Sequence, residues 1–286
     1  MKNKKKILGI LVILGTLIAG WIVWGNNALM VNELTIKNDR IPSGFSGFRI
    51  AQISDLHNAE FGEDNEKLLS MLAECEPDII LITGDLVDSR RTDIEIGISF
   101  SEKAAMIAPT YYVTGNHEAR IEEYNDLIEG LEKAGVHVLK DECVLLERSG
   151  DTIAVAGIED PGFVTDYLFG HSETVVKDTL TELISDESIY TILLAHRPEL
   201  FEIYVECEVD LVFSGHAHGG QFRLPFVGGL VAPNQGLFPE YDAGLYTKNS
   251  TDMIVSRGIG NSILPVRINN RPEIVLAELQ SEEYEK

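Results

Sequence analysis

The chain has 286 residues, of which 44% are hydrophobic and 24% charged, so it can bury a sizeable core and is not of the disordered class. Its 46 acidic residues against 23 basic ones give a formal net charge of −23 at pH 7. Such a charge repels polyanions, which argues against bulk binding of nucleic acid. An anionic substrate must then be held by local positive charge, and metal ions are the obvious source.

The N-terminal segment has the signature of a membrane anchor. Lys2, Lys4, Lys5 and Lys6 precede an uncharged apolar stretch over residues 7–24. As a helix this stretch measures roughly 27 Å, sufficient to cross a hydrocarbon core. The lysines predict a cytoplasmic N-terminus and place the rest of the chain outside the cytoplasm. Secretion after signal-peptide cleavage is the alternative, and the anchor is favoured because no clean Ala-x-Ala site follows.

After the anchor the pattern predicts one folded domain. Alternation over residues 33–37 predicts a first strand, although its start is uncertain. Apolar spacing predicts helices over 65–75, 94–108, 121–134, 175–185 and 199–205, and strands over 136–139, 142–147 and 152–158. The chain therefore divides into an anchor (1–27), a leading strand and linker (28–47), a single domain (48–280) and an acidic tail (281–286).

The order of these elements predicts an α/β fold. Strands that alternate with helices form a largely parallel sheet, and ligands bind beyond the carboxyl ends of its strands. The strand-rich segment over residues 224–279 indicates a second sheet packed on the first, with the helices outside.

Five strand-like apolar runs end on residues of the kinds that bind metals. Five of the seven histidines lie at these ends. The run 50–53 leads into Asp55 and His57, and the run 78–82 leads into Asp85. The run 111–113 leads into Asn116, His117 and Glu118. The run 191–194 leads into His196 and Arg197, and the run 209–213 leads into His216 and His218.

Aspartate and histidine together suit borderline divalent metals such as Mn²⁺, Fe²⁺ and Zn²⁺. Asp55 and His57 stand at i and i+2, a spacing that on a strand places both on one face and lets both reach one ion. His216 and His218 share that spacing. Singly, each residue has an ordinary structural role in a cap, a turn or a polar cleft, and it is the ordered set that indicates a metal site.

These motifs resemble the calcineurin-like metallophosphoesterase superfamily, whose signature is Asp-x-His, Gly-Asp, Gly-Asn-His-Glu/Asp, a lone His and Gly-His-x-His. Residues 48–222 contain every block, and the segments 215–221, 256–260 and 271–274 are similar to its membrane-anchored or exported bacterial branch. The resemblance implies a four-layer αββα sandwich and two metals. It implies that Asp55, His57 and His218 hold the first metal, that Asn116, His196 and His216 hold the second, and that Asp85 bridges them.

The resemblance also implies a reaction. A hydroxide bridging the two metals would attack phosphorus, and His117, which is not a ligand, would protonate the leaving oxygen as general acid. Arg197 is a candidate phosphate contact, with a plain salt bridge as the favoured alternative.

The function expected is a membrane-tethered two-metal hydrolase of phosphoester bonds, a phosphodiesterase or phosphomonoesterase acting on small molecules or envelope components. One alternative is a pyrophosphatase for a nucleotide-linked lipid precursor, like a UDP-2,3-diacylglucosamine hydrolase. Such precursors are made on the cytoplasmic side, opposite the predicted orientation. The other is a non-catalytic metal-binding scaffold, which the presence of His117 disfavours because a scaffold needs no general acid.

Overall fold

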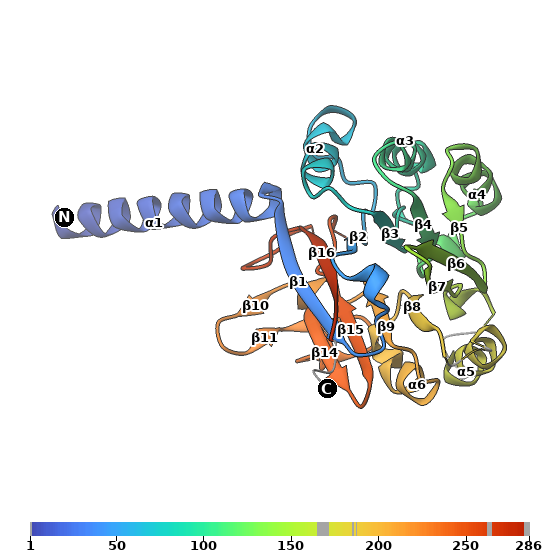
Figure 1. Ribbon diagram of the computed structural model, residues 1–286. Helices are drawn as coiled ribbons and strands as arrows, with labels where there is room; N and C mark the ends of the chain where they lie inside the picture. The colour runs from blue at the N-terminus through green and yellow to red at the C-terminus, as the bar shows by residue number, and fades with distance from the viewer. Residues whose placement is uncertain (1, 165–171, 185, 187, 262–264, 283–286) are drawn as a thin grey trace.

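The computed structural model describes residues 2–164, 172–184, 186, 188–261 and 265–282. The chain begins with a single long helix, α1 (Lys2–Asn27), which projects from the body of the protein (Figure 1). Within the described residues it is the one helix long and apolar enough to cross a membrane, and none of its membrane-length window is buried. The apolar segment predicted from the sequence is therefore a helix that extends out of the domain.

Two sheets form the centre of the body. In the described residues the first has six strands in the order β1-β16-β2-β3-β4-β5. The strands β2 to β5 are parallel, while β16 runs antiparallel to β2 and parallel to β1. Their bounds are β1 Met30–Asn38, β2 Arg49–Ile53, β3 Ile79–Thr83, β4 Thr110–Val113, β5 His137–Val138 and β16 Glu273–Ser281.

The second sheet also has six strands within the described residues, in the order β14-β15-β9-β8-β7-β6. Its central strands β7, β8, β9 and β15 are parallel, and the edge strands β6 and β14 are antiparallel to their neighbours. Their bounds are β6 Glu142–Arg148, β7 Asp151–Gly157, β8 Tyr190–Leu194, β9 Leu211–Ser214, β14 Gly244–Lys248 and β15 Thr251–Val255.

Side-chain alternation along the buried strands explains why the sheets stack. In β2, Ile50 joins the core between the two sheets, while its neighbour Ala51 packs toward the helices. In β9, Phe213 joins the same central core and Val212 packs on the other side. The first sheet is covered by α2 (Glu66–Glu74), α3 (Ile94–Ala105) and α4 (Tyr124–Lys133), and the second by α5 (Ser172–Leu183) and α6 (Phe201–Glu206) (Figure 1). The expected four-layer αββα sandwich is confirmed.

Several boundaries differ from those predicted. Strand β1 begins at Met30, because its backbone pairs with β16 in unbroken register, which requires no alternation of side chains. Helix α4 begins at Tyr124 rather than at residue 121, since Ile121 has extended backbone angles. Helix α6 begins at Phe201, after a 3₁₀ turn over Pro198–Leu200. The end of the predicted helix at residue 185 and most of the acidic tail lie outside the described residues.

The five run-end motifs do not follow strands of one sheet. Three follow β2, β3 and β4 of the first sheet, and two follow β8 and β9 of the second. Hydrogen bonds join the two sheets at this end of their strands: Gln52 of β2 donates to the carbonyl of Ser214 in β9 over 2.9 Å, and His196 Nδ1, after β8, lies 2.7 Å from the carbonyl of Thr83 in β3. The site is therefore built across the seam between the sheets.

Two short hairpins follow the last of these motifs. Strands β10 (Arg223–Leu224) and β11 (Gly228–Gly229) form the first, and β12 (Val231–Ala232) and β13 (Gly236–Leu237) form the second. Figure 1 shows the first hairpin projecting from the body on the side from which α1 leaves.

Candidate metal centre

Two groups of buried side chains that can hold metal ions lie at this seam. In each group the candidate ligand atoms all lie within 4.8 Å of one another, and Asp85 belongs to both. The first group is Asp55, His57, Asp85 and His218, and the second is Asp85, His196 and His216. The sequence predicted these six residues from motifs far apart in the chain, and the fold brings them together.

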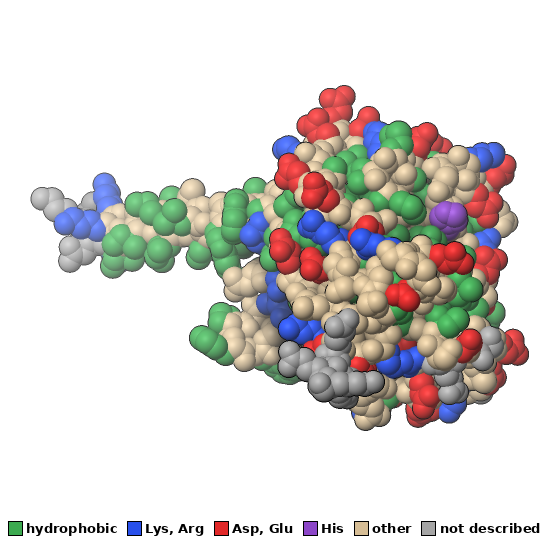
Figure 2. Space-filling view, viewed as in Figure 1, with side chains coloured by type: hydrophobic (Ala, Val, Ile, Leu, Met, Phe, Trp, Pro, Cys, Tyr) green, Lys and Arg blue, Asp and Glu red, His purple; other side chains and the backbone are tan. Residues whose placement is uncertain are grey.

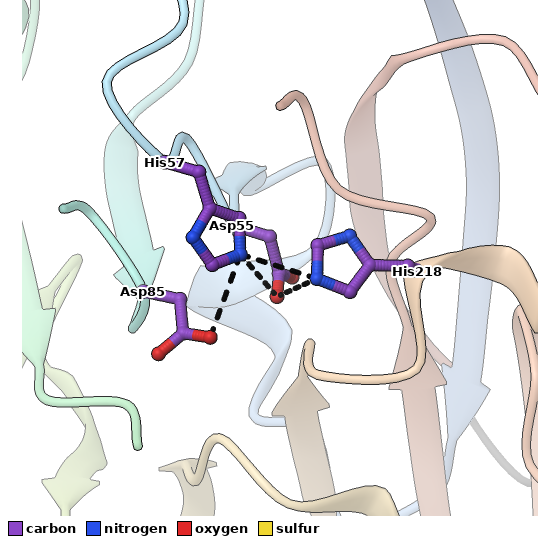
Figure 3. A group of neighbouring side chains, drawn as sticks. All are labelled: Asp55, His57, Asp85 and His218. Carbon is purple, nitrogen blue, oxygen red and sulfur yellow. Dashed lines mark hydrogen bonds and ion pairs between the residues drawn. The ribbon is translucent and has the colours of Figure 1, made fainter. Parts of the chain in front are cut away.

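The first group converges on a common point. His57 Nε2 lies 3.1 Å from His218 Nε2 and 3.5 Å from Asp85 Oδ2. The Oδ1 atom of Asp55 lies 3.4 Å from His218 Nε2. Figure 3 shows these side chains pointing toward one another, with Asp55 and His57 on the loop after β2 and Asp85 and His218 on two other loops. Two imidazole nitrogens 3.1 Å apart with carboxylate oxygens beside them form a donor set that suits a divalent transition metal.

The second group shares the Asp85 carboxylate group with the first. His196 Nε2 is 3.3 Å from Asp85 Oδ2, and the rings of His196 and His216 have centroids 5.0 Å apart. Asn116, predicted as a further ligand, is buried, and its Oδ1 has no hydrogen-bond partner within the described residues. An acceptor left unpaired in the interior is costly, and a cation would satisfy it. The residues present therefore fit a second metal.

Five of the predicted ligands have a strained backbone. Asp55, His57, Asp85, His216 and His218 all lie in the left-handed region, with φ between 46° and 63°. Non-glycine residues adopt this region rarely, and such strain concentrates at functional sites. It also corrects the reasoning from strand alternation: β2 ends at Ile53, so Asp55 and His57 lie on a turn and not on one face of a strand.

Glu118 holds the loop that carries Asp85. It is fully buried, and its carboxylate accepts the backbone N–H groups of Gly115 over 2.7 Å, Asp85 over 3.0 Å and Val87 over 3.2 Å. The close approach of the two loops explains Gly115, because a β-carbon there would collide with the carboxylate of Asp85. The only indication of this role in the sequence is that a glutamate completes the Gly-Asn-His-Glu motif.

Burial keeps most of the imidazoles neutral, as metal binding requires. It lowers the pKa of His57 to about 3, and holds the pKa values of His216 and His218 well below the ordinary histidine value. Neighbouring imidazoles add to the effect, because a second positive charge in the same buried cluster is unfavourable.

The pKa values of Asp55 and His196 are shifted upward, whereas the neighbouring imidazoles hold the pKa of Asp85 well below the ordinary carboxyl value against the effect of its burial. Burial raises the pKa of Asp55 to about 6, and the negative charge of Asp85 adds to this effect. Burial also opposes the charged form of His196, but the carboxylates of Asp85, Asp55 and Asp160 together outweigh it and raise the pKa of His196 to about 10. Without a metal, the cluster therefore keeps protons to balance its negative charge. Divalent cations would supply that balance instead.

His117 lies at the edge of both groups without belonging to either. Its Nε2 is 3.9 Å from Asp85 Oδ2, and its Nδ1 accepts the backbone N–H of Ser89 over 3.0 Å. Asp88 lies close by, with Oδ1 3.7 Å from the same Nδ1. Burial lowers the pKa of this imidazole. The sequence indicated that His117 faces the site, but not that Ser89 orients it.

Arg197 is tied to Asp160. The guanidinium donates to both carboxylate oxygens of Asp160, over 2.6 and 2.7 Å, and both side chains are buried. This geometry is the salt bridge favoured from the sequence. Two residues that sequence reasoning missed lie beside His216 instead: Glu199 Oε1 at 3.8 Å and Asn234 Nδ2 at 3.3 Å from its Nε2. Neither stands in a motif, so no local pattern could have found them.

Comparison with known proteins agrees with this geometry. The family model for the calcineurin-like phosphoesterases matches residues 48–220, which is more than half of the chain. The chain belongs to the calcineurin-like phosphoesterase family. Among its relatives in the family are the metallophosphoesterase YkuE of Bacillus subtilis, 32% identical over 257 residues, and the phosphodiesterase YaeI of Escherichia coli, 30% identical over 240 residues. These matches cover 87% and 81% of this chain, and 85% and 82% of the relatives.

A further relative is named as a transmembrane protein. The transmembrane protein with metallophosphoesterase domain of Danio rerio is 30% identical over 256 residues, which are 85% of this chain but 56% of that protein. Among solved structures, the TT1561 protein of Thermus thermophilus shares the fold, with a TM-score of 0.52 at 16% identity over 75% of this chain and 91% of that one. The family assignment makes this chain a metal-dependent phosphoester hydrolase, and α1 together with the Danio rerio relative supports membrane association.

Proposed function

We propose that this phosphoesterase uses two divalent cations, one on each side of Asp85, to hydrolyse phosphodiesters on the outer side of the membrane that α1 crosses. The observation that supports it most is the position of Asp85, which belongs to both buried ligand groups. Asp55, His57 and His218 would complete the first site, and Asn116, His196 and His216 the second. Mn²⁺, Fe²⁺ and Zn²⁺ all suit such mixed imidazole and carboxylate ligands.

When bound, two divalent ions generate a nucleophile from water near neutral pH and neutralise charge on the phosphoryl oxygens. The protein's own residues do the rest. Glu118 holds Asp85 in place, because its carboxylate accepts the backbone N–H of Asp85 on one loop and that of Gly115 on the other. His117 carries its N–H on Nε2, the atom that faces Asp85, so it can donate a hydrogen bond to the leaving oxygen and stabilise the negative charge that develops there.

Two observations favour a phosphodiester over a monoester. The relative YaeI, 30% identical, is named a phosphodiesterase. In addition, the guanidinium of Arg197 is occupied by Asp160 and does not offer the extra positive charge that a dianionic monoester would favour. The proposed outward orientation rests on the lysines at positions 2, 4, 5 and 6, which precede the apolar part of α1.

The experiment is a substrate screen of the purified chain with Mn²⁺, Fe²⁺ and Zn²⁺ supplied in turn. The substrates are bis-p-nitrophenyl phosphate, p-nitrophenyl phosphate and a nucleotide-linked lipid pyrophosphate. We expect the diester to be hydrolysed fastest. Preference for the pyrophosphate would replace the proposed substrate class, and preference for the monoester would contradict the diester assignment.

The variant Asp85→Asn tests the same proposal by a change in the protein instead of a change of substrate. It should lose bound metal and hydrolysis together, because both ligand groups lose a charged oxygen. The matched control is Asp126→Asn on the exposed face of α4, which should behave as the parent chain. An Asp85→Asn variant that kept its metal and its activity would contradict the shared role of this carboxylate.

A further inference from the structure

The β10–β11 hairpin has an exposed apolar tip. Phe226 is fully exposed, and Leu224 and Val227 are 44% and 59% exposed. Figure 2 shows apolar side chains at the end of this projection, on the side of the body from which α1 leaves. A single exposed apolar residue is ordinary, but a protruding cluster of three indicates a contact with an apolar partner.

The base of the hairpin is fixed to the end of the membrane helix. Arg223, the first residue of β10, donates its backbone N–H to the carbonyl of Ile268 over 2.9 Å. The same segment is joined to α1, since Asn26 and Arg267 exchange two hydrogen bonds of 2.8 and 2.9 Å. Trp21, Trp24 and residues 268–271 line one cavity. The hairpin therefore starts at the level of the two tryptophans of α1.

Tryptophans at the end of a membrane helix lie at the membrane–water interface. Arg271 packs beside them, with its guanidinium 5.1 Å from the ring of Trp24. A hairpin that starts at this level and projects on the side of α1 directs its tip toward the bilayer (Figure 1).

The charge pattern of the chain also suits a membrane contact. Residues 224–239 contain no charged side chain, although 24% of the chain is charged and its net charge is −23. The acidic body would be repelled by anionic lipid, so a close approach requires an uncharged surface. The second hairpin extends that surface, because Leu237 and Phe238 are 69% and 60% exposed and the N–H of Phe238 bonds to the carbonyl of Leu230.

We propose that the tip of this hairpin, residues 224–227, inserts into the bilayer that α1 crosses and forms a second membrane contact. The contact would restrain rotation of the domain about α1. His218, a predicted metal ligand, stands five residues before β10, and its carbonyl accepts a hydrogen bond from Asn270 on the segment joined to α1. The metal centre would thereby face substrates at the lipid surface, a consequence that rests on the proposed function.

The test measures the depth of a spin label in the full-length chain and does not depend on catalysis. The chain is reconstituted in vesicles of phosphatidylcholine with a minor fraction of phosphatidylglycerol. Cys143 and Cys207, which are exposed and half-buried, are replaced by serine, and the buried Cys75 is kept. Labels are placed at Phe226→Cys and, as a second site on the tip, at Val227→Cys.

The matched control is Leu145→Cys. Its side chain is 59% exposed, like that of Val227, but it lies on β6, at the side of the body opposite α1 (Figure 1). Oxygen concentrates in the bilayer and a nickel chelate in water, so the ratio of their collision rates with each label reports its depth. We expect oxygen to dominate at positions 226 and 227 and the nickel chelate to dominate at position 145.

Two results would overturn the proposal. If the labels at 226 and 227 meet the nickel chelate as often as the label at 145 does, the tip lies in water. If they are protected from both reagents, a protein surface covers the tip, and the partner is a second copy or another protein. Because no substrate is turned over, either result leaves the proposed function untouched.

Discussion

Ser89 donates its backbone N–H to Nδ1 of His117 over 3.0 Å, and this contact assigns the proton of the neutral imidazole to Nε2. Nε2 is also the atom that faces the metal centre, 3.9 Å from Asp85 Oδ2. A backbone donor therefore selects the tautomer in which His117 presents an N–H group toward the reacting phosphate.

Replacing this imidazole should slow the reaction without emptying the site. We expect His117→Ala to retain its metals, since His117 belongs to neither ligand group. Its rate should fall about 10²–10³-fold for poor leaving groups and less for p-nitrophenol, whose anion needs little stabilisation. The measurement is kcat against leaving-group pKa. Ser89→Ala is a comparison variant: it removes the hydroxyl, which lies 3.1 Å from Nδ1, but keeps the backbone N–H, so it should lose much less activity. Equal turnover by His117→Ala and the parent for every leaving group would remove His117 from the mechanism.

Glu118 should matter for stability and metal affinity together. Its carboxylate accepts three backbone N–H groups, and Glu118→Gln would turn an amide N–H₂ toward some of them. A buried donor facing other donors costs about 1–3 kcal/mol in the free energy of unfolding. Chemical denaturation and metal titration check both effects. Glu122→Gln, on the exposed surface nearby, is the control. Equal stability and metal affinity in both variants would show that Glu118 does not hold the Asp85 loop.

Variants of the Arg197–Asp160 pair distinguish a structural role of Arg197 from a role in substrate binding. Arg197→Met should lower the free energy of unfolding by about 3–5 kcal/mol, because it leaves the Asp160 carboxylate buried and unpaired. Adding Asp160→Asn removes that charge and should recover most of the stability. If Arg197 is only structural, the double variant also recovers activity. A stable double variant with a raised KM would instead show that Arg197 contacts the substrate.

Asp210, which lies away from the metal site, should make the free energy of unfolding depend on pH. It lies at the start of β9, where it accepts the N–H of Thr191 over 2.8 Å and pairs with Arg40 at 2.8 Å. Burial raises its pKa to about 6, so the folded chain holds the proton more tightly than the unfolded chain does. This contribution to stability is complete below the ordinary carboxyl pKa and is lost as the pH rises through about 6.

The Asp210→Asn variant cannot titrate at this position. The free energy of unfolding of the parent, relative to that of the variant, should therefore fall between about pH 4 and 6. Denaturation at several pH values measures this difference. Asp178→Asn, on the exposed face of α5, is the control and should follow the parent throughout. A constant difference between parent and Asp210→Asn would contradict the shifted pKa.

The sequence identified the candidate metal ligands that the fold groups together, but not the geometry that joins them. Each motif stands directly after a buried strand, so its place at a strand end could be read from local apolar runs. The assignment of the five motifs to two different sheets depends on strand order, which is a long-range property. Strand β16, for example, inserts between β1 and β2 from the other end of the chain.

The residues that support the site were harder to find. Ser89, Glu199 and Asn234 act through contacts between loops that no local spacing encodes. The left-handed backbone of Asp55 and His57 was likewise missed, because their i, i+2 spacing is equally compatible with a strand and with a turn. Helix ends shifted for a similar reason: local turns such as Pro198–Leu200 use residues that also favour helices.

The most direct measurement is an anomalous difference map from crystals of the chain loaded with Mn²⁺. The account predicts two peaks about 3.5–4 Å apart, with the carboxylate of Asp85 between them. His57 and His218 should contact one peak, and His196 and His216 the other. A single peak, or two peaks that do not share Asp85, would contradict it.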